Sequence, residues 1–387
     1  MIANVAKKRF RWVVLIAALA CGLLALALPG QARAATSQAR AATGSATQPS
    51  TPWSKVGPGW SLVEYSLGTA GEPSKPGPTT LYLISPAGQR FPLYHWSPKG
   101  GIPSLLDWSG DKTRALLFAP NGGLEQLTLT TGKVTHFSLA GQADPVGYTR
   151  PSGSQLIGTS LTKSGNTMVG RYSLTGKLLK VLTISSNGAS VIGSADGRTL
   201  VVSTTKGAEL VSNSGGVIRQ LPVRGTASNT CRPVRWWSSS TVMLSCASNG
   251  SNPASRLWLV PANGARPTAL TPQRSTSSRD LGDMDAWQIS GGMYLQAAGP
   301  CGTVQLFRQA SNGSITLLSP AGTTRNDLIM TVSGSRMLLD AQTGCPGSVS
   351  LLWYNPRTKA EQWLFHTPAA QIGVMATVPY YTRENAF

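Results

Sequence analysis

Residues 189–223 read ASVIGSADGRTLVVSTTKGAELVSNSGGVIRQLPV, and four apolar segments within them are separated by short polar turns. Val, Ile, Leu and Thr favour β-strands. The turns at Gly197 and Gly215 permit tight reversals, because glycine tolerates positive φ. The stretch therefore predicts four antiparallel strands joined in sequence, over 189–194, 199–204, 208–212 and 217–223.

The same four-strand unit recurs along the chain, for example over residues 105–140. Its last hairpin turn is the clearest marker, and successive markers lie 39 to 49 residues apart. The markers are Gly88, Gly132, Gly176, Gly215, Gly264, Gly313 and the segment around Arg357. A four-stranded sheet cannot bury both of its faces without neighbours, so this period predicts the blades of a β-propeller.

Seven markers predict an all-β, seven-bladed propeller over residues 60–381, followed by a tail over 382–387; six or eight blades are the alternatives. The first unit lacks its innermost strand, and the apolar stretch IGVMATVPYY from Ile372 has no other partner. We expect that stretch to close the ring against the first unit. The chain of 387 residues has 13% charged residues, 42 Gly and 26 Pro, a composition that argues against a coiled coil or a helical bundle.

The segments DWSGDKTRALLFAP (107–120) and GSADGRTLVVST (193–204) place an Asp/Gly turn between two strands. This pattern resembles the WD-like repeats of secreted TolB-type propellers, and the resemblance covers nearly all of residues 60–381. It implies a propeller with a protein-interaction or envelope-associated role. It implies no catalytic residue, because the motif is degenerate and the fold hosts many functions.

The N-terminus has the pattern of an export signal. Four cations lie in residues 1–11, an uncharged apolar run covers 12–28, and Ala32-Arg33-Ala34 has small residues at the cleavage positions. We expect a signal peptide over 1–34 and a secreted or extracellular protein. Association with the cell envelope is compatible with this expectation. A retained membrane anchor and lipidation at Cys21 are the alternatives. Residues 35–59 are rich in Ala, Thr, Ser and Pro and predict a disordered tether.

Four cysteines remain outside the signal, and an even number in an exported chain predicts disulfides. Three pairings are open: a two-residue turn at Ser238-Ser239 would place Cys231 opposite Cys246, while Cys301 and Cys345 lie one blade period apart. Each bridge would be structural.

No catalytic or phosphate-binding motif is present, and the three histidines are expected on outer strands of different blades. We predict no cofactor and no specific nucleic-acid motif. A weak metal candidate is the carboxylate cluster Asp280, Asp283 and Asp285. The alternative for this cluster is neutralisation by Arg274 and Arg279.

Positive charge is the remaining signal, because 34 Lys and Arg against 15 Asp and Glu give a net charge of +19. Residues 211–279 contain eight arginines and no acid. The strand assignment places several of these arginines on one face, beside tryptophans. The candidate ligand-binding residues are Arg224, Arg232, Arg235, Arg256, Arg274, Arg279, Trp236 and Trp237. The opposite face also collects cations, namely Arg90, Lys112, Arg114, Lys133, Arg150, Lys177 and Arg198, so a generally basic surface is the alternative.

These observations favour a non-enzymatic binding or scaffolding module whose partner is an anionic envelope polymer or an acidic protein. A propeller enzyme is the competing hypothesis. It requires that polar residues of the first strands, such as Asp107, Arg235 and Asp285, meet in the central channel. A structural component of an envelope assembly is the third hypothesis; the oligomeric state does not follow from the residues.

Overall fold

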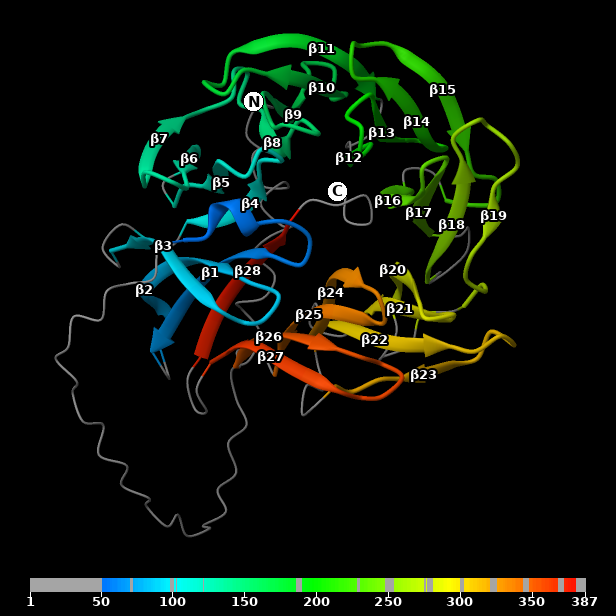
Figure 1. Ribbon diagram of the computed structural model, residues 1–387. Helices are drawn as coiled ribbons and strands as arrows, with labels where there is room; N and C mark the ends of the chain where they lie inside the picture. Colours follow the sequence, from blue (N-terminus) through cyan, green and yellow to red (C-terminus); the bar gives the residue numbers. More distant parts are fainter. Residues whose placement is uncertain are drawn as a thin grey trace, which may run out of the picture. The chain divides into compact units, whose positions relative to one another are not determined.

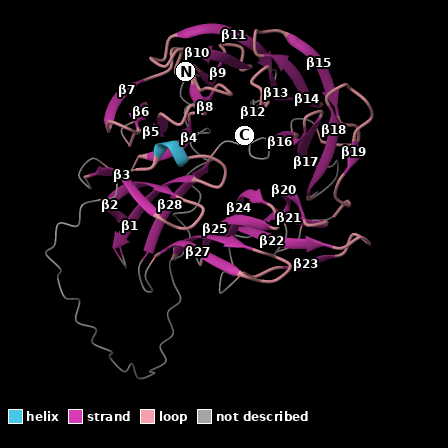
Figure 2. Cartoon of the chain, viewed as in Figure 1, coloured by secondary structure: helices cyan, strands magenta, loops and turns pink. Residues whose placement is uncertain are grey.

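In the part of the chain that the computed structural model describes, the regular secondary structure is almost entirely β-strand (Figure 2). The described residues are 51–69, 72–97, 101, 103–120, 122–185, 190–227, 230–247, 254–274, 276, 281–299, 303–320, 326–343, 348–367 and 372–380. The predicted signal peptide, the tether up to residue 50 and the predicted tail over 382–387 lie outside these residues. No helix among the described residues has the length and apolar character needed to cross a membrane.

The strands in chain order are β1 (Ser61–Thr69), β2 (Glu72–Ile84), β3 (Arg90–Trp96), β4 (Ser104–Trp108), β5 (Arg114–Phe118), β6 (Leu124–Thr128), β7 (Lys133–Phe137), β8 (Asp144–Tyr148), β9 (Leu156–Leu161), β10 (Thr167–Tyr172), β11 (Leu178–Ser185), β12 (Val191–Gly193), β13 (Thr199–Thr204), β14 (Gly207–Ser212), β15 (Val217–Pro222), β16 (Arg232–Ser238), β17 (Thr241–Ala247), β18 (Ser255–Pro261), β19 (Thr268–Ala269), β20 (Gly282–Ile289), β21 (Gly292–Ala298), β22 (Val304–Gln309), β23 (Ile315–Leu317), β24 (Asn326–Ser333), β25 (Arg336–Gln342), β26 (Val349–Tyr354), β27 (Glu361–His366) and β28 (Ile372–Pro379).

These described strands pair in antiparallel groups of four. Blade 1 has the order β28-β1-β2-β3, and blades 2, 3, 4 and 7 consist of β4–β7, β8–β11, β12–β15 and β24–β27. The sheet of β16–β23 consists of two further groups, blade 5 (β16–β19) and blade 6 (β20–β23). A single parallel pair, Ser255 with Gly282, joins these two groups.

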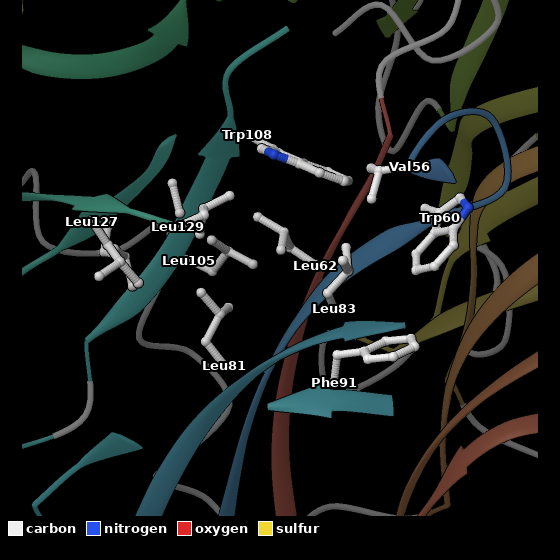
Figure 3. Close-up of a cluster of buried hydrophobic side chains, with 12 residues drawn as sticks. Val56, Trp60, Leu62, Leu81, Leu83, Phe91, Leu105, Trp108, Leu127 and Leu129 are labelled. Carbon is white, nitrogen blue, oxygen red and sulfur yellow. The ribbon is translucent and has the colours of Figure 1, made fainter. Parts of the chain in front are cut away.

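Apolar clusters hold each blade against the next. Among the described residues there are seven such clusters, and each contains buried side chains from two consecutive blades. Figure 3 shows the cluster between blades 1 and 2, where Leu62 and Leu83 meet Leu105 and Trp108. Another cluster packs Leu338 of blade 7 against Val63 of blade 1 and completes the circuit. The predicted β-propeller fold is therefore confirmed.

The strand that completes blade 1 comes from the other end of the sequence. β28 pairs with β1, with a register that runs from Ser61 opposite Pro379 to Gly68 opposite Ile372. This pairing was predicted for the apolar C-terminal stretch (Figure 1). We call the first strands β28, β4, β8, β12, β16, β20 and β24 the inner strands. Inner strands of different blades contact one another, as in the pairs β28–β4, β4–β8, β12–β16 and β24–β28.

The predicted hairpin markers lie between the third and fourth strands of the blades. All six marker glycines have positive φ, from 70° at Gly132 to 93° at Gly215. In the seventh turn, where no glycine is present, Lys359 has a φ of 59°. These backbone conformations explain why glycine recurs at this period.

Residues 51–59, which sequence analysis assigned to the tether, differ from that expectation. Trp53–Lys55 form a short 3-10 helix, and Val56 is only 3% exposed in the cluster between blades 1 and 2. Trp60 lies in the same cluster and stacks against Phe91 with ring centroids 5.9 Å apart. Apolar side chains at this end of the segment therefore anchor it to the propeller.

Candidate functional site

Four of the predicted arginines lie at one end of the strands of blades 4 and 5. Arg224 follows β15, Arg232 begins β16, Arg256 is the second residue of β18, and Arg274 follows β19. In an antiparallel four-stranded blade, the first and third strands start where the second and fourth strands end. These arginines therefore share one face, which we call the entry face because the inner strands begin there.

The four arginines differ in how freely they face solvent. Arg224 and Arg232 are exposed. Arg256 is half-buried, donates a hydrogen bond from Nε to the carbonyl oxygen of Thr271, and lies over the Trp258 ring at 4.9 Å. Arg274 forms an ion pair with a buried carboxylate. Arg224 and Arg232 are thus the exposed cations of this predicted set.

Arg235 has a different position, because it is buried between blades 5 and 6. Its Nε lies 3.0 Å from Oδ1 of Asp285, and its Nη2 donates to the carbonyl oxygen of Ala286. Its guanidinium also lies 3.8 Å from the centroid of the Trp287 ring. Burial raises the pKa of Asp285, while the charge of Arg235 opposes that rise. Arg235 therefore connects two blades and does not reach the entry surface.

The two predicted ligand-stacking tryptophans pack within the propeller. Trp236 is 8% exposed in the cluster between blades 4 and 5. Trp237 is partly buried against the cluster between blades 5 and 6. Both side chains therefore contribute to blade packing, which is the common role of alternating tryptophans on strands.

The described part of the acidic cluster is paired with arginines. Asp283 is fully buried and forms an ion pair with Arg274, and Asp285 pairs with Arg235. Asp280 and Arg279 lie outside the described residues. Arginines therefore neutralise both described carboxylates, as the alternative interpretation of this cluster predicts. Arg274 pairs with Asp283 as that interpretation predicts, and Arg235 pairs with Asp285.

A pocket of about 240 Å³ lies where blades 5, 6 and 7 meet. Its lining is mostly apolar, with charged or amide groups from Arg235, Asp285 and Gln296. The other lining residues are Val234, Met284, Trp287, Val304, Leu328, Ile329 and Met330. The sequence predicts Arg235 and Asp285 as channel residues but not the apolar lining, because bulges at Val234, Met284 and Met330 depart from the period-two alternation of a strand. A second hollow, of about 450 Å³, lies beside His136 in blade 2.

The histidines do not form a common site. His95, His136 and His366 lie on β3, β7 and β27, the fourth strands of three blades, as predicted. Each faces a polar residue of the neighbouring third strand. Nδ1 lies 2.9 Å from Thr80 Oγ1 for His95, 3.5 Å from Glu125 Oε1 for His136 and 2.8 Å from Ser350 Oγ for His366.

The polar inner-strand residues that the enzyme hypothesis requires do not all meet. Asp107 in β4 accepts hydrogen bonds from the backbone N of Tyr148 at 2.7 Å and from Arg150 Nη2 at 2.8 Å. Arg235 and Asp285 pair with each other between blades 5 and 6, whereas Asp107 and Arg150 pair between blades 2 and 3. Arg150, which the sequence predicts among the cations of the opposite face, does not contribute to that surface, because it is buried and its charge is paired with Asp107.

The predicted bridge between Cys231 and Cys246 is present, with Cα atoms 4.0 Å apart. The hairpin register beside it agrees with the prediction, since Arg232 lies opposite Ser245. The turn itself is one residue later than predicted, at Ser239-Ser240, and two bulges restore the register. Cys301 and Cys345 lie outside the described residues.

Comparisons with known proteins agree with the fold. No family model matches the chain, and no curated protein matches it. A puromycin-hydrolysing peptidase of Mycobacterium tuberculosis matches with a TM-score of 0.52 and 14% identity, over 80% of this chain and 53% of that chain. The chain thus spans about half the length of that peptidase.

Two further solved structures show lower overall similarity. The β-propeller domain of the Trilobed protease from Pyrococcus furiosus matches with a TM-score of 0.48 and 12% identity, over 79% of this chain and 94% of that domain. A protein of Agrobacterium tumefaciens assigned as TolB matches with a TM-score of 0.41 and 12% identity, over 82% and 98% of the two chains. The chain is a β-propeller protein, and a TolB is among the propellers to which it is similar. At these identities the comparisons show the fold alone.

Proposed function

We propose that this protein is an exported, non-enzymatic binding propeller whose entry face at blades 4 and 5 takes an anionic polymer or an acidic protein. The observation that carries the proposal is the position of Arg224 and Arg232, which are exposed on the same face as Arg256. Residues 211–279 contain no acid that would neutralise this face from within the segment. Guanidinium groups bind carboxylate and phosphate in a bidentate way.

Three carboxylates of the inner strands are paired with arginines, which supports a binding role over a catalytic one. Asp107 is held by Arg150, Asp283 by Arg274 and Asp285 by Arg235. Each pair joins residues that lie in different loops or blades, so each has a structural role in the described propeller. A general acid or base needs access to its substrate. Asp107 and Asp283 have little access to a substrate, since they are nearly or fully buried.

Binding to two acidic probes, poly-L-glutamate and dextran sulfate, tests the proposal. Isothermal titration calorimetry across a salt series would compare the protein with the variant Arg224→Ser/Arg232→Ser. We expect wild-type affinity to fall with salt, and the variant to bind about three- to tenfold more weakly.

The matched control is Arg219→Ser/Arg266→Ser, which removes the same charge from exposed positions in β15 and in the β18–β19 turn. We expect it to keep more affinity than the entry-face variant. Equal losses in the two variants would show that net charge alone drives binding and would overturn the assignment to the entry face.

A second candidate function is an enzyme whose active site is the pocket between blades 5, 6 and 7. It is favoured by Asp285, whose carboxyl lines the pocket with a pKa raised by burial. The similarity to a puromycin-hydrolysing peptidase adds a substrate to try. Hydrolysis of puromycin that is lost in Asp285→Asn would support this candidate, whereas the binding proposal predicts no turnover by either protein.

A further inference from the structure

The inner strands of five blades each contain a bulge, at the third residue of β4, β8, β16 and β20 and at the fifth residue of β24. In each, the pairing with the second strand skips one residue, and the skipped residue is apolar. The skipped residues are Leu106 in β4, Val146 in β8, Val234 in β16, Met284 in β20 and Met330 in β24. Bulges turn a side chain away from the regular alternation of the sheet.

The core does not fully bury the side chains at these bulges. Met284 is 42% exposed and Leu106 is 37% exposed, and the other three are partly exposed. The residues on either side of two of these bulges pack between blades or make ion pairs, as Asp283 and Asp285 do around Met284 and Leu105 and Asp107 do around Leu106. Five apolar side chains that stay partly accessible at bulges of the inner strands indicate a surface suited to an apolar group.

In blades 5, 6 and 7 three of these residues line one pocket. Val234, Met284 and Met330 surround it together with Leu328, which is 37% exposed. Its volume of about 240 Å³ exceeds the roughly 150 Å³ of a cavity that holds benzene. Methionine adapts its shape to an incoming group. The pocket therefore has the size and lining to take one large apolar side chain.

The pocket lies close to the cations of the entry face. Val234 follows Arg232 by two residues in β16, a separation of about 7 Å along a strand. Met284 is the third residue of β20, and its neighbour Asp283 pairs with Arg274. An apolar pocket beside the exposed Arg232 and the Arg274–Asp283 ion pair matches the usual anatomy of a protein interface, in which a buried anchor is surrounded by a polar rim.

We infer that the pocket receives an aromatic side chain of an acidic polypeptide that is bound on the entry face. The inference rests on the proposed function and narrows it to an acidic protein. A charged glycan offers no apolar side chain to fill the pocket. A lipid offers an acyl chain, which is longer than a pocket of this volume holds. An acidic segment with one tryptophan supplies both the charge and the anchor.

Two acidic peptides of equal charge and length, differing only in a central Trp or Gly, test the inference by calorimetry. We expect the Trp peptide to bind the protein about tenfold more tightly than the Gly peptide. The variant Met284→Ser, and separately Leu328→Ser, should reduce this difference to about twofold. Leu106→Ser is the matched control, because Leu106 is an equally exposed bulge residue that does not line the pocket; it should keep the tenfold difference.

The outcomes separate the inference from the proposed function. Equal binding of both peptides, with the loss in Arg224→Ser/Arg232→Ser retained, would overturn the anchor and leave the anionic partner in place. Absence of salt-dependent binding of either peptide would overturn the proposed function and the anchor with it. Dodecyl phosphate that binds more tightly than the Trp peptide, and that loses affinity in Met284→Ser, would assign the pocket to a lipid and contradict the inference.

Discussion

Arg150, just after inner strand β8, forms an ion pair with Asp107 of inner strand β4, with Nη2 and Oδ1 2.8 Å apart. Both side chains are only 5% exposed. Arg150 also donates from Nη1 to the carbonyl oxygen of Trp108 at 3.0 Å, and Asp107 accepts from the backbone N of Tyr148. The connection between blades 2 and 3 thus combines a buried charge pair with bonds to the backbone of both strands.

Replacing Arg150 by alanine should destabilise the protein strongly, because it leaves the carboxylate of Asp107 buried without its partner. We expect a loss of about 3–5 kcal/mol in the free energy of unfolding. Urea denaturation would measure it. The control Arg198→Ala removes an exposed arginine that lies 3.7 Å from Asp196, and should cost about 1 kcal/mol or less. Similar losses in both variants would contradict a structural role for the Arg150–Asp107 pair.

Glu64 gives the propeller a pH-dependent stability. Its side chain is 4% exposed, and its Oε2 accepts a hydrogen bond from the backbone N of Leu105 in the next blade at 2.6 Å. Burial raises the pKa of Glu64 from 4.5 to about 8. Because the folded state holds this proton more tightly than the unfolded state, the stabilisation is complete below pH 4.5 and is lost as the pH rises through 8.

We expect the free energy of unfolding to fall between pH 5 and 9 by up to about 1.4 kcal/mol per pH unit for this group. Glu64→Gln keeps an acceptor oxygen without the titration, so its stability should vary less and exceed wild type above pH 8. Melting temperatures over this range would measure both. Asp340, whose pKa burial raises to about 7, adds dependence of the same sign in both proteins. Parallel pH profiles would rule out the role of Glu64.

The Cys231–Cys246 bridge should contribute measurably to stability, because it joins residues separated by 15 positions and so closes a covalent loop that contains the β16–β17 hairpin. For such a loop the expected contribution is about 3 kcal/mol. The double variant Cys231→Ser/Cys246→Ser, compared with wild type by denaturation without reductant, would measure it. Unchanged stability would mean that the bulged hairpin holds its register without the bridge.

Gly282 is required where blades 5 and 6 join. Its φ is 124°, and an added Cβ would lie 2.2 Å from the backbone N of Ser255. Gly282→Ala should therefore cost about 2–4 kcal/mol. Gly291 has a φ of 77° and open space around its Cα, so Gly291→Ala should cost only about 1 kcal/mol. Chemical denaturation of the two variants would separate the steric clash at Gly282 from the backbone preference that both glycines share. Equal losses of stability in the two variants would contradict the steric clash.

The repeated strand pattern was readable from the sequence because it rests on local rules. Glycines at the C-terminal hairpin of each unit have the positive φ that the pattern requires, and the stretch from Ile372 pairs with β1 as its apolar composition predicts. The Cys231–Cys246 pairing followed from counting residues across one hairpin. Each of these features depends on neighbours along a strand or across a turn.

The candidate site was less readable because it depends on contacts between blades. Nothing local distinguishes Arg150, which is buried, from Arg232, which is exposed; the difference is that Asp107 of another blade faces Arg150. The bulge at Met284 shifts the strand by one residue, which period-two alternation does not predict. The pocket between three blades follows from such shifts.

The pairing of β28 with β1 joins segments that are separated by nearly the whole propeller. During synthesis β1 is made early, and its free edge has no partner until residues 372–379 emerge. An unpaired strand edge is a template for mispairing with other chains. Until residues 372–379 have been synthesised, the first blade therefore has an unpaired strand edge. A chaperone that shields this edge would protect the protein from mispairing until β28 is in place.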